Sequence, residues 1–356
     1  MKAFFYVQHL LGIGHLKRAA AVTRALRAAG VEVTLASGGM PVDGIEVLQL
    51  PPLSSPDFKT LLDQHGRPVD EAWKARRRDA LLAAFQGHDA LIVELFPFGR
   101  RQMRFELIPL LEKAQSGLVV CSVRDLLQPN PAKEAEALER FEQYFDHLLV
   151  HGDPRIATFE RTFGLAARLA GRLHYTGYVV DEPPAGGDAG AGEVLVSAGG
   201  GAVGRRLLEA AIAARPLTRL RDRTWRVLAG VNAADLGALG GDGVIVERAR
   251  NDFTLRLRNC VLSVSQAGYN TVMEALQAGA RAVLVPYAGG GESEQTSRAR
   301  LLAGRGLVQV VEENALAPQA LAAAIGRALA APRPAPGAVD LDGARKSAEL
   351  VRGWLA

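Results

Sequence analysis

The chain has 356 residues, of which 48% are hydrophobic and 22% are charged, and its formal net charge is +4 at pH 7. This composition excludes a disordered chain, and the small positive excess gives no reason to expect a nucleic-acid partner. A chain of this length exceeds what one hydrophobic core usually serves, so we expect two domains.

The first half of the chain alternates predicted strands and helices. Residues 4–7 form an apolar run, the glycine turn Gly12–His15 follows, and an Ala-, Leu- and Arg-rich segment extends to Ala29. This order predicts a strand, a turn and a helix that Gly30 ends. Further apolar runs predict strands at residues 31–35, 90–93 and 118–123.

The second half repeats this order. The apolar run 194–196 leads to the glycine-rich turn 197–201 and then to a predicted helix at 203–214. Further apolar runs predict strands at residues 225–228, 244–246, 261–264 and 282–285. Because strands that alternate with helices form parallel sheets, we predict an α/β fold of two Rossmann-like domains, with ligands at the carboxyl ends of the strands.

Composition also predicts the domain boundaries. Residues 181–192 are rich in Pro, Gly and Ala, which suits an interdomain linker. We therefore expect an N-terminal Rossmann-like domain at residues 1–180 and a C-terminal domain at residues 193–338. Residues 339–356 contain a last amphipathic helix, which is a candidate to pack back on the N-terminal domain.

Gly199, Gly201 and Gly204 have the spacing of a dinucleotide-binding turn between a strand and a helix. A nicotinamide or flavin site also needs an acidic residue at the end of the next strand, to bind the adenosine ribose. That strand ends at residues 227–230, and its counterpart in the first half ends at residues 35–37, both without an acid. An oxidoreductase is therefore disfavoured, and the alternative is that these glycines only turn the chain.

The segment 261–286 predicts a strand, a small-residue turn, a short helix and a second strand. The turn from Ser265 to Thr271 can direct backbone N–H groups and a helix N-terminus at phosphate oxygens. Glu274, one turn later, can accept hydrogen bonds from sugar hydroxyls, although an exposed helix glutamate is the simpler alternative. This segment predicts a site for a nucleotide diphosphate.

His15 lies at a predicted helix start, directly after the Gly12-Ile-Gly14 turn. The positive helix end disfavours imidazolium, so a neutral imidazole is available as a general base. A capping or packing histidine is the alternative. Glu94 and Asp125 are rival candidates, because a buried carboxylate with a raised pKa is also a competent base.

Three motifs together carry a family resemblance, and they occur in both halves of the chain. They are Gly12-x-Gly14-His15, Ser265-x-x-Gly268-x-Asn270-Thr271-x-x-Glu274 and Glu294-Gln295. They resemble two-domain nucleotide-sugar glycosyltransferases of the GT-B fold, grouped with the peptidoglycan N-acetylglucosaminyltransferase that acts on a lipid-linked acceptor and carrying a family 28 C-terminal domain. Segments 96–100, 122–126, 150–154 and 268–271 look like a narrower bacterial group of predicted glycosyltransferases.

The resemblance implies an inverting, metal-independent glycosyltransferase that moves a sugar from a nucleoside diphosphate, with uridine as the expected base, to an acceptor hydroxyl. His15 is then the catalytic residue. The donor and its nucleotide are expected at Gly199, Gly200, Gly201, Ser265, Ala267, Gly268, Asn270, Thr271, Glu274, Glu294 and Gln295. The acceptor side is expected at Gly12, Gly14, Phe98, Arg100 and Arg124.

No cofactor is expected, because the sequence has no His/Cys cluster with metal-ligand spacing. The acceptor is unidentified. The basic run 74–78 is either a solvated helix face or a contact with an anionic or lipid-linked acceptor. The alternatives in function are a nucleotide-sugar hydrolase or epimerase of the same fold, or a non-catalytic nucleotide-sugar-binding protein.

The chain is expected in the cytoplasm, and peripheral attachment to the inner face of the membrane fits a lipid-linked acceptor. No apolar run approaches the length of about 18 residues that a membrane-spanning helix needs. Residues 1–7 resemble the start of a signal peptide, but Gln8 and His9 end the apolar stretch. Cys121 and Cys260 lie in apolar runs and are expected to be inert core thiols.

Overall fold

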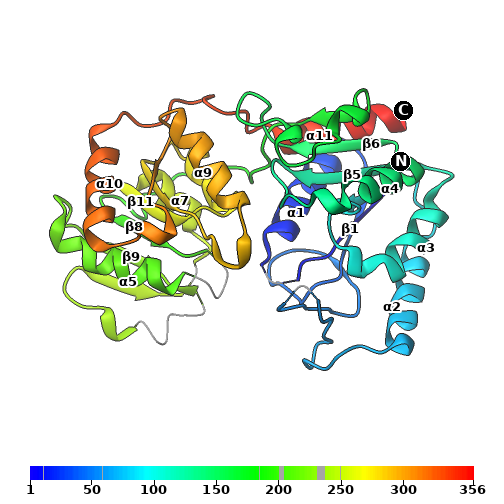
Figure 1. Ribbon diagram of the computed structural model, residues 1–356, viewed down its shortest axis with the longest axis horizontal. Helices are drawn as coiled ribbons and strands as arrows, with labels where there is room; N and C mark the ends of the chain where they lie inside the picture. The colour runs from blue at the N-terminus through cyan, green and yellow to red at the C-terminus, as the bar shows by residue number, and fades with distance from the viewer. Residues whose placement is uncertain (11, 58, 184, 200–203, 231–236, 249) are drawn as a thin grey trace. The chain divides into compact units, whose positions relative to one another are not determined.

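The computed structural model describes residues 1–10, 12–57, 59–183, 185–199, 204–230, 237–248 and 250–356. The chain divides into two compact units, and each contains a parallel sheet covered by helices (Figure 1). Unit 1 comprises Met1–Val179 and Asp342–Ala356, and unit 2 comprises Val180–Leu341. The prediction of an α/β fold with two parallel sheets is confirmed.

In unit 1 the sheet has the strand order β3-β2-β1-β4-β5-β6-β7, and neighbouring strands pair in parallel. Its strands are β1 (Lys2–Val7), β2 (Glu32–Ser37), β3 (Leu48–Gln49), β4 (Ala90–Glu94), β5 (Leu118–Arg124), β6 (His147–His151) and β7 (Leu173–Tyr175). The order reverses between β1 and β4, because the chain builds outward from β1 in both directions. Such a reversal opens a crevice at the carboxyl ends of the two strands.

Helices cover both faces of this sheet, so its central strands are mostly apolar. Successive side chains of β1 alternate between two cores: Phe4 and Tyr6 pack with α2, α3 and α4, whereas Phe5 and Val7 pack with α1 and α11. The helices are α1 (Gly14–Ala28), α2 (Glu71–Ala84), α3 (Arg104–Ala114), α4 (Glu134–Tyr144) and α11 (Gly343–Leu355). Short 3₁₀ turns are η1 (Arg101–Met103), η2 (Pro131–Lys133), η3 (Phe159–Arg161) and η4 (Ala166–Leu169).

The sheet of unit 2 has the order β10-β9-β8-β11-β12-β13 and is also parallel. Its strands are β8 (Val194–Ser197), β9 (Trp225–Leu228), β10 (Val244–Glu247), β11 (Leu262–Gln266), β12 (Ala282–Val285) and β13 (Gln309–Val310). Here the order reverses between β8 and β11. The two sheets therefore share one plan, with the reversal beside the first strand of each unit.

Helices α5 and α10 pack together on one face of this second sheet (Figure 1). The helices are α5 (Arg205–Ala214), α7 (Phe253–Asn259), α8 (Tyr269–Gln277), α9 (Glu294–Gly304) and α10 (Pro318–Ala330). Short 3₁₀ turns are η5 (Arg215–Leu217), η7 (Gly237–Leu239), η8 (Gly289–Gly291) and η9 (Glu313–Ala315). Cys121 in unit 1 and Cys260 in unit 2 are both buried free thiols, as expected.

The last helix, α11, belongs to unit 1 and lies against α1 (Figure 1). The N–H of Gly343 donates to the carbonyl oxygen of Tyr178, 3.0 Å away. A side chain at position 343 would approach that backbone to 2.6 Å or less, so only glycine allows this close contact. The predicted linker 181–192 lies in unit 2, where α7 and α8 side chains donate to its carbonyl groups.

The basic run of α2 is not a uniform solvated face, because Arg77 is buried. Its guanidinium makes a bidentate ion pair with Glu106 of α3, at 2.7 and 2.9 Å, and also donates to Gln8. The hydroxyl of Tyr6 donates to the same carboxylate at 2.5 Å. This network joins α2 and α3 to β1.

We expect Arg77→Met to destabilise the protein by about 3 to 5 kcal/mol, because it leaves the Glu106 carboxylate buried without its partner. Arg78→Met is the matched control, since the ion pair of Arg78 with Asp79 is exposed. We expect the control to change stability by less than about 0.5 kcal/mol. Urea unfolding of both variants checks this, and equal stability of the two would contradict it.

Candidate active site

His15 lies in the first turn of α1, at the carboxyl end of β1. Its Nδ1 is 3.0 Å from Oε1 of Glu94, the last residue of β4. The two side chains therefore meet at the β1/β4 strand-order reversal, where parallel sheets bind ligands. The sequence predicted each residue separately, and the structure brings them together.

Glu94 is an ionised carboxylate in the protein interior. Burial acts to raise its pKa, but the guanidinium of Arg18 and the hydrogen bonds from His15 and Ser122 hold that pKa well below its usual range. Arg18 lies one turn after His15 on α1 and bonds the same Oε1 atom that His15 bonds. With both oxygens engaged, Glu94 is suited to orient a neighbour and poorly suited to accept a proton.

His15 is a neutral imidazole. Burial lowers its pKa to about 3, and Arg100 and Arg18 act in the same direction, whereas Glu94 acts to raise it. Because the Glu94 carboxylate only accepts, Nδ1 of His15 carries the proton and Nε2 presents the lone pair. This geometry can accept a proton at Nε2. It favours His15 over Glu94 as a base, although the catalytic assignment remains a prediction.

Asp125, the third candidate base, follows β5 and is buried. Its Cβ packs against Gly152, where an added side chain would approach to 2.7 Å. This tight packing fixes the position of Asp125 beside the residue that follows β6. Its role as an alternative base stays a prediction.

Two predicted acceptor-side arginines follow neighbouring strands. Arg124 ends β5, and Arg100 follows β4 in a left-handed conformation with φ of 59°. Burial, with Arg124 nearby, lowers the pKa of Arg100 to about 10. Nε of Arg100 donates to the carbonyl oxygen of Gln8 at 2.8 Å, and no carboxylate within the described ranges forms an ion pair with it. A partly buried cation that has no direct ion-pair partner among these residues, although Glu94 acts on it at longer range, favours an anionic ligand.

The other three residues predicted on the acceptor side are Gly12, Gly14 and Phe98, and they lie at different places in the fold. Gly12 is exposed before α1, and Gly14 is the first residue of that helix. Phe98 is half-buried in an aromatic cluster, with ring centroids 5.0 Å from Phe163 and 5.4 Å from Phe159. The ring of Phe98 therefore has a packing role, and its predicted contact with an acceptor stays a prediction.

In unit 2 the predicted donor residues gather at the β8/β11 reversal. Gly199 follows β8 with φ of 74°, a conformation that favours glycine. Ser265 and Ala267 are buried at and just after the end of β11. Gly268 is the N-cap of α8, Asn270 and Thr271 lie in its first turn, and Glu274 is half-buried one turn later. Gly200 and Gly201 lie outside the described residues.

The N-terminus of α8 offers backbone N–H groups at this reversal. Its N-cap is a glycine with no side chain to accept from them, and its first turn contains no acidic residue. The first N–H groups of a helix and its dipole together form an anion-binding site. The arrangement can hold phosphate oxygens at the helix end, with the Glu274 carboxylate one turn away.

Glu294 and Gln295 have partners within unit 2. Glu294 is buried in an ion pair with Arg298, at 2.7 Å, and the Arg298 guanidinium lies over the ring of Tyr269. Oε1 of Gln295 accepts from the N–H of Tyr287 at 3.1 Å. Both side chains thus fix the loop and helix after β12. Their predicted contact with the donor sugar stays a prediction.

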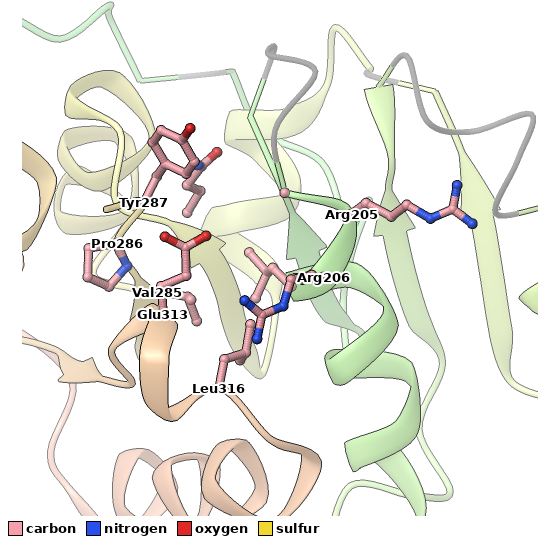
Figure 2. Close-up of a pocket in the computed structure, with 10 residues that line it drawn as sticks. Arg205, Arg206, Val285, Pro286, Tyr287, Glu313 and Leu316 are labelled. Atoms are coloured by element: carbon pink, nitrogen blue, oxygen red, sulfur yellow. The ribbon is translucent and has the colours of Figure 1, made fainter. Parts of the chain in front are cut away.

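A hollow of about 250 Å³ lies at the carboxyl ends of β11 and β12. Figure 2 shows the side chains of Arg206 and Glu313 extending into it and Arg205 extending away. It is lined by Gly204, Arg205, Arg206, Leu207, Gln266, Val285, Pro286, Tyr287, Glu313 and Leu316. Sequence reasoning missed Gln266 and Tyr287 here, although polar residues at or just after a buried parallel strand could have indicated them.

Unit 1 contains further polar residues that sequence reasoning did not select. Arg18 and Ser122 bond Glu94, and His151 bonds Ser122. His151 is the fully buried last residue of β6. The signal that could have found Ser122 and His151 is the same as for Glu94, namely a polar residue near the carboxyl end of a buried strand.

Within the described ranges, no cluster of three or more His, Cys, Asp or Glu side chains could hold a metal ion. The same ranges contain no helix that is both long enough and apolar enough to cross a membrane.

Comparison with known proteins identifies the fold. A structure of MurG from Acinetobacter baumannii covers 99% of this chain and 100% of its own, with a TM-score of 0.64 and 15% identity. The glycotransferase of kitacinnamycin gives a TM-score of 0.65 at 18% identity, covering 100% of this chain and 99% of its own. Spinosyn rhamnosyltransferase SpnG complexed with thymidine diphosphate also gives 0.65, at 17% identity, covering 99% of each chain.

Sequence comparison concerns a shorter segment. Residues 240–341 match the glycosyltransferase family 28 C-terminal domain. Over 109 residues the chain is 35% identical to a Rhodospirillum centenum protein, the UDP-N-acetylglucosamine--N-acetylmuramyl-(pentapeptide) pyrophosphoryl-undecaprenol N-acetylglucosamine transferase. The match covers 29% of this chain and 29% of that relative, so it spans less than a third of the relative's length.

The chain has the GT-B fold of glycosyltransferases, with two Rossmann-like units. More narrowly, the part of unit 2 that contains α8 and α9 matches the glycosyltransferase family 28 C-terminal domain. In its fold and over this segment the chain is therefore similar to glycosyltransferases.

We expect stability to fall as the pH drops from 6.5 to 5, because burial lowers the pKa of His15 and of His151 to about 3. In this window the unfolded chain binds protons that the folded chain does not. Each of these two histidines should then lower the free energy of unfolding by about 2 kcal/mol as the pH drops from 6.5 to 5. His151→Asn should reduce the loss by about that amount.

Urea unfolding at pH 7 and at pH 5 measures this loss. Amide hydrogen exchange in the strands of unit 1 shows whether the loss occurs in that unit. His65→Asn is the control, because His65 is exposed and its replacement should leave the loss unchanged. An equal pH dependence in wild type and His151→Asn would show that His151 is not a neutral buried group.

Proposed function

We propose that this protein is an inverting glycosyltransferase that moves a sugar from a nucleoside diphosphate to an acceptor hydroxyl. The observation that carries the proposal is the pair of neutral His15 and ionised Glu94 at the strand-order reversal of unit 1. The uncapped N-terminus of α8, at the equivalent reversal of unit 2, supports the donor half of the proposal.

In the proposed reaction, Nε2 of His15 accepts the proton of the acceptor hydroxyl as its oxygen attacks the anomeric carbon. The new carbon–oxygen bond forms on one face while the bond to the phosphate oxygen breaks on the other, which inverts the anomeric configuration. The electron pair of the broken bond leaves with the diphosphate. Glu94 stabilises the imidazolium that forms on His15 and keeps its ring oriented.

The leaving diphosphate gains charge as its bond to the sugar breaks, and the site must stabilise that charge. We propose that the N–H groups and dipole of α8 do so without a divalent metal ion, and that Glu274 binds the ribose hydroxyls. The name of the curated relative specifies a UDP-linked sugar, which supports uridine, whereas the structural neighbour SpnG is complexed with thymidine diphosphate.

For the acceptor we propose an anionic, lipid-linked molecule. The partly buried Arg100 near Arg124 favours an anionic group, and the name of the curated relative specifies a pyrophosphoryl-undecaprenol acceptor. A lipid-linked acceptor would bring the protein to the inner face of the membrane as a peripheral protein.

Two other classes of function make different predictions for one experiment, in which the protein is incubated with a panel of nucleotide sugars. A hydrolase releases free sugar without an acceptor, and an epimerase changes the sugar while it remains on its nucleotide. A non-catalytic binding protein retains the ligand unchanged. Native mass spectrometry of the purified protein identifies a retained nucleotide and thereby the base.

We expect His15→Asn to lower kcat by about 100-fold or more, because general bases contribute 10²- to 10⁴-fold to rates. Nucleotide affinity should stay within about twofold of wild type, since His15 lies in unit 1 and the proposed nucleotide site lies in unit 2. Transfer assays and isothermal titration with the free nucleoside diphosphate measure both. Unchanged turnover with intact binding would refute the base assignment.

We expect Glu274→Gln to weaken nucleotide-sugar binding by about tenfold, because hydrogen bonds to a charged group exceed neutral ones by roughly 1 to 1.5 kcal/mol. A 2′,3′-dideoxynucleotide, which lacks both of these ribose hydroxyls, should bind both proteins equally. Glu142→Gln is the control, since Glu142 pairs with Arg168 on the surface of unit 1. If both variants bind like wild type, Glu274 does not contact the ribose.

A further inference from the structure

A chain of buried hydrogen bonds continues from Glu94 away from His15. Oγ of Ser122 is 2.6 Å from Oε2 of Glu94 and 2.9 Å from Nε2 of His151. Nδ1 of His151 is 2.9 Å from Oγ1 of Thr176. Glu94, Ser122 and His151 lie on β4, β5 and β6, and Thr176 directly follows β7, so the chain crosses four neighbouring strands at their carboxyl ends.

Water does not reach these groups, because Glu94, Ser122, His151 and Thr176 are each at most 1% exposed. Each polar proton of these four side chains must therefore be donated to an acceptor within the protein. The positions of the protons can therefore be found by matching each donor proton to an available acceptor. Ser122 has one hydroxyl proton and two neighbours that could accept it, the carboxylate and the imidazole.

The charge of Glu94 decides where that proton goes. A hydrogen bond to an ionised carboxylate is about twice as strong as one between neutral groups, so Ser122 donates to Oε2 of Glu94. Oγ of Ser122 then accepts from Nε2–H of His151. Burial lowers the pKa of His151 to about 3, so the ring is neutral and its Nδ1 carries no proton.

Because Nδ1 of His151 is unprotonated, the hydroxyl of Thr176 donates to it. The order of donation is therefore Thr176 to His151, His151 to Ser122, and Ser122 to Glu94. In the competing order, Thr176 donates to the carbonyl oxygen of Gly177, 2.9 Å away, and His151 carries its proton on Nδ1. Ser122 would then donate to His151, and Oε2 of Glu94 would lose its bond.

We propose that Ser122 and His151 are positioning residues, which fix the Glu94 carboxylate so that it holds His15 in the tautomer with a proton on Nδ1 and a lone pair on Nε2. Ser122 occupies Oε2, which leaves Oε1 to His15 and Arg18. His151 orients the Ser122 hydroxyl and satisfies its lone pair. The two histidines consequently have opposite tautomers.

The proposed effect of these hydrogen bonds on catalysis rests on the proposed function. The order of donation from Thr176 to Glu94 does not. A purely structural role is the rival explanation. It predicts that removing the Ser122 hydroxyl changes stability alone. A positioning role predicts, in addition, a change in the tautomer equilibrium of His15 and a loss of kcat without a matching change in KM.

The first test needs no variant. Long-range ¹H–¹⁵N NMR of the full chain, with ¹⁵N-labelled histidine, distinguishes the two tautomers of each ring at neutral pH. We expect His151 with its proton on Nε2 and His15 with its proton on Nδ1. A proton on Nδ1 of His151 would overturn the proposal, because Ser122 would then donate to His151 and not to Glu94.

The second test compares Ser122→Ala with Ser37→Ala. Ser37 is equally buried, ends β2 of the same sheet and has no hydrogen-bond partner for its hydroxyl among the described residues. We expect Ser122→Ala to mix the His15 tautomers and to lower kcat about tenfold with KM within about twofold, because one bond to a charged group is lost. Ser122→Thr, which keeps the hydroxyl, should restore both, and Ser37→Ala should change neither.

The two hypotheses fail separately. Wild-type protein that transfers no sugar, yet has the expected tautomers and the expected response to Ser122→Ala, would refute the transferase proposal and leave the hydrogen-bond order intact. Ser122→Ala with wild-type tautomers and wild-type kcat would refute the positioning role, even in an active transferase.

Discussion

The Glu94 carboxylate is the group on which the arrangement of unit 1 depends. An ionised carboxylate in a protein interior is costly unless charges and hydrogen bonds surround it. Here Arg18 and His15 come from α1, and Ser122 comes from β5, so one charge joins a helix to two strands. The same carboxylate that these contacts stabilise also orients His15, whose neutral state comes from burial.

Both units have a change of strand order in their parallel sheet, and in both the candidate site residues lie beside it. A parallel sheet buries both faces, so polar groups can emerge only at the ends of its strands, and a change in strand order opens a crevice there. In unit 1 that crevice contains His15 and Glu94, and in unit 2 it contains the start of α8. One architecture thus places a neutral imidazole in one unit and a helix N-terminus without a side-chain cap in the other.

Much of this could be predicted from the sequence, because its signals are local. Apolar runs between helices indicated the sheets, and the small-residue turn before Glu274 indicated the start of α8. Contacts between distant residues could not be predicted, since no local pattern states that Ser122 and His151 bond each other. The pairing of Glu294 with Arg298 is an exception that was missed, because their spacing of four places both on one helix face.

The position of α11 has a consequence for synthesis of the chain. Unit 1 is discontinuous, since the polypeptide leaves it at Val179 and returns at Asp342. The helix that covers α1 therefore leaves the ribosome only after all of unit 2 has been made. Until then the side of α1 that packs against α11 has no cover, so a nascent or prematurely terminated chain presents this surface to chaperones and proteases. Completion of the first unit thus depends on translation of the second.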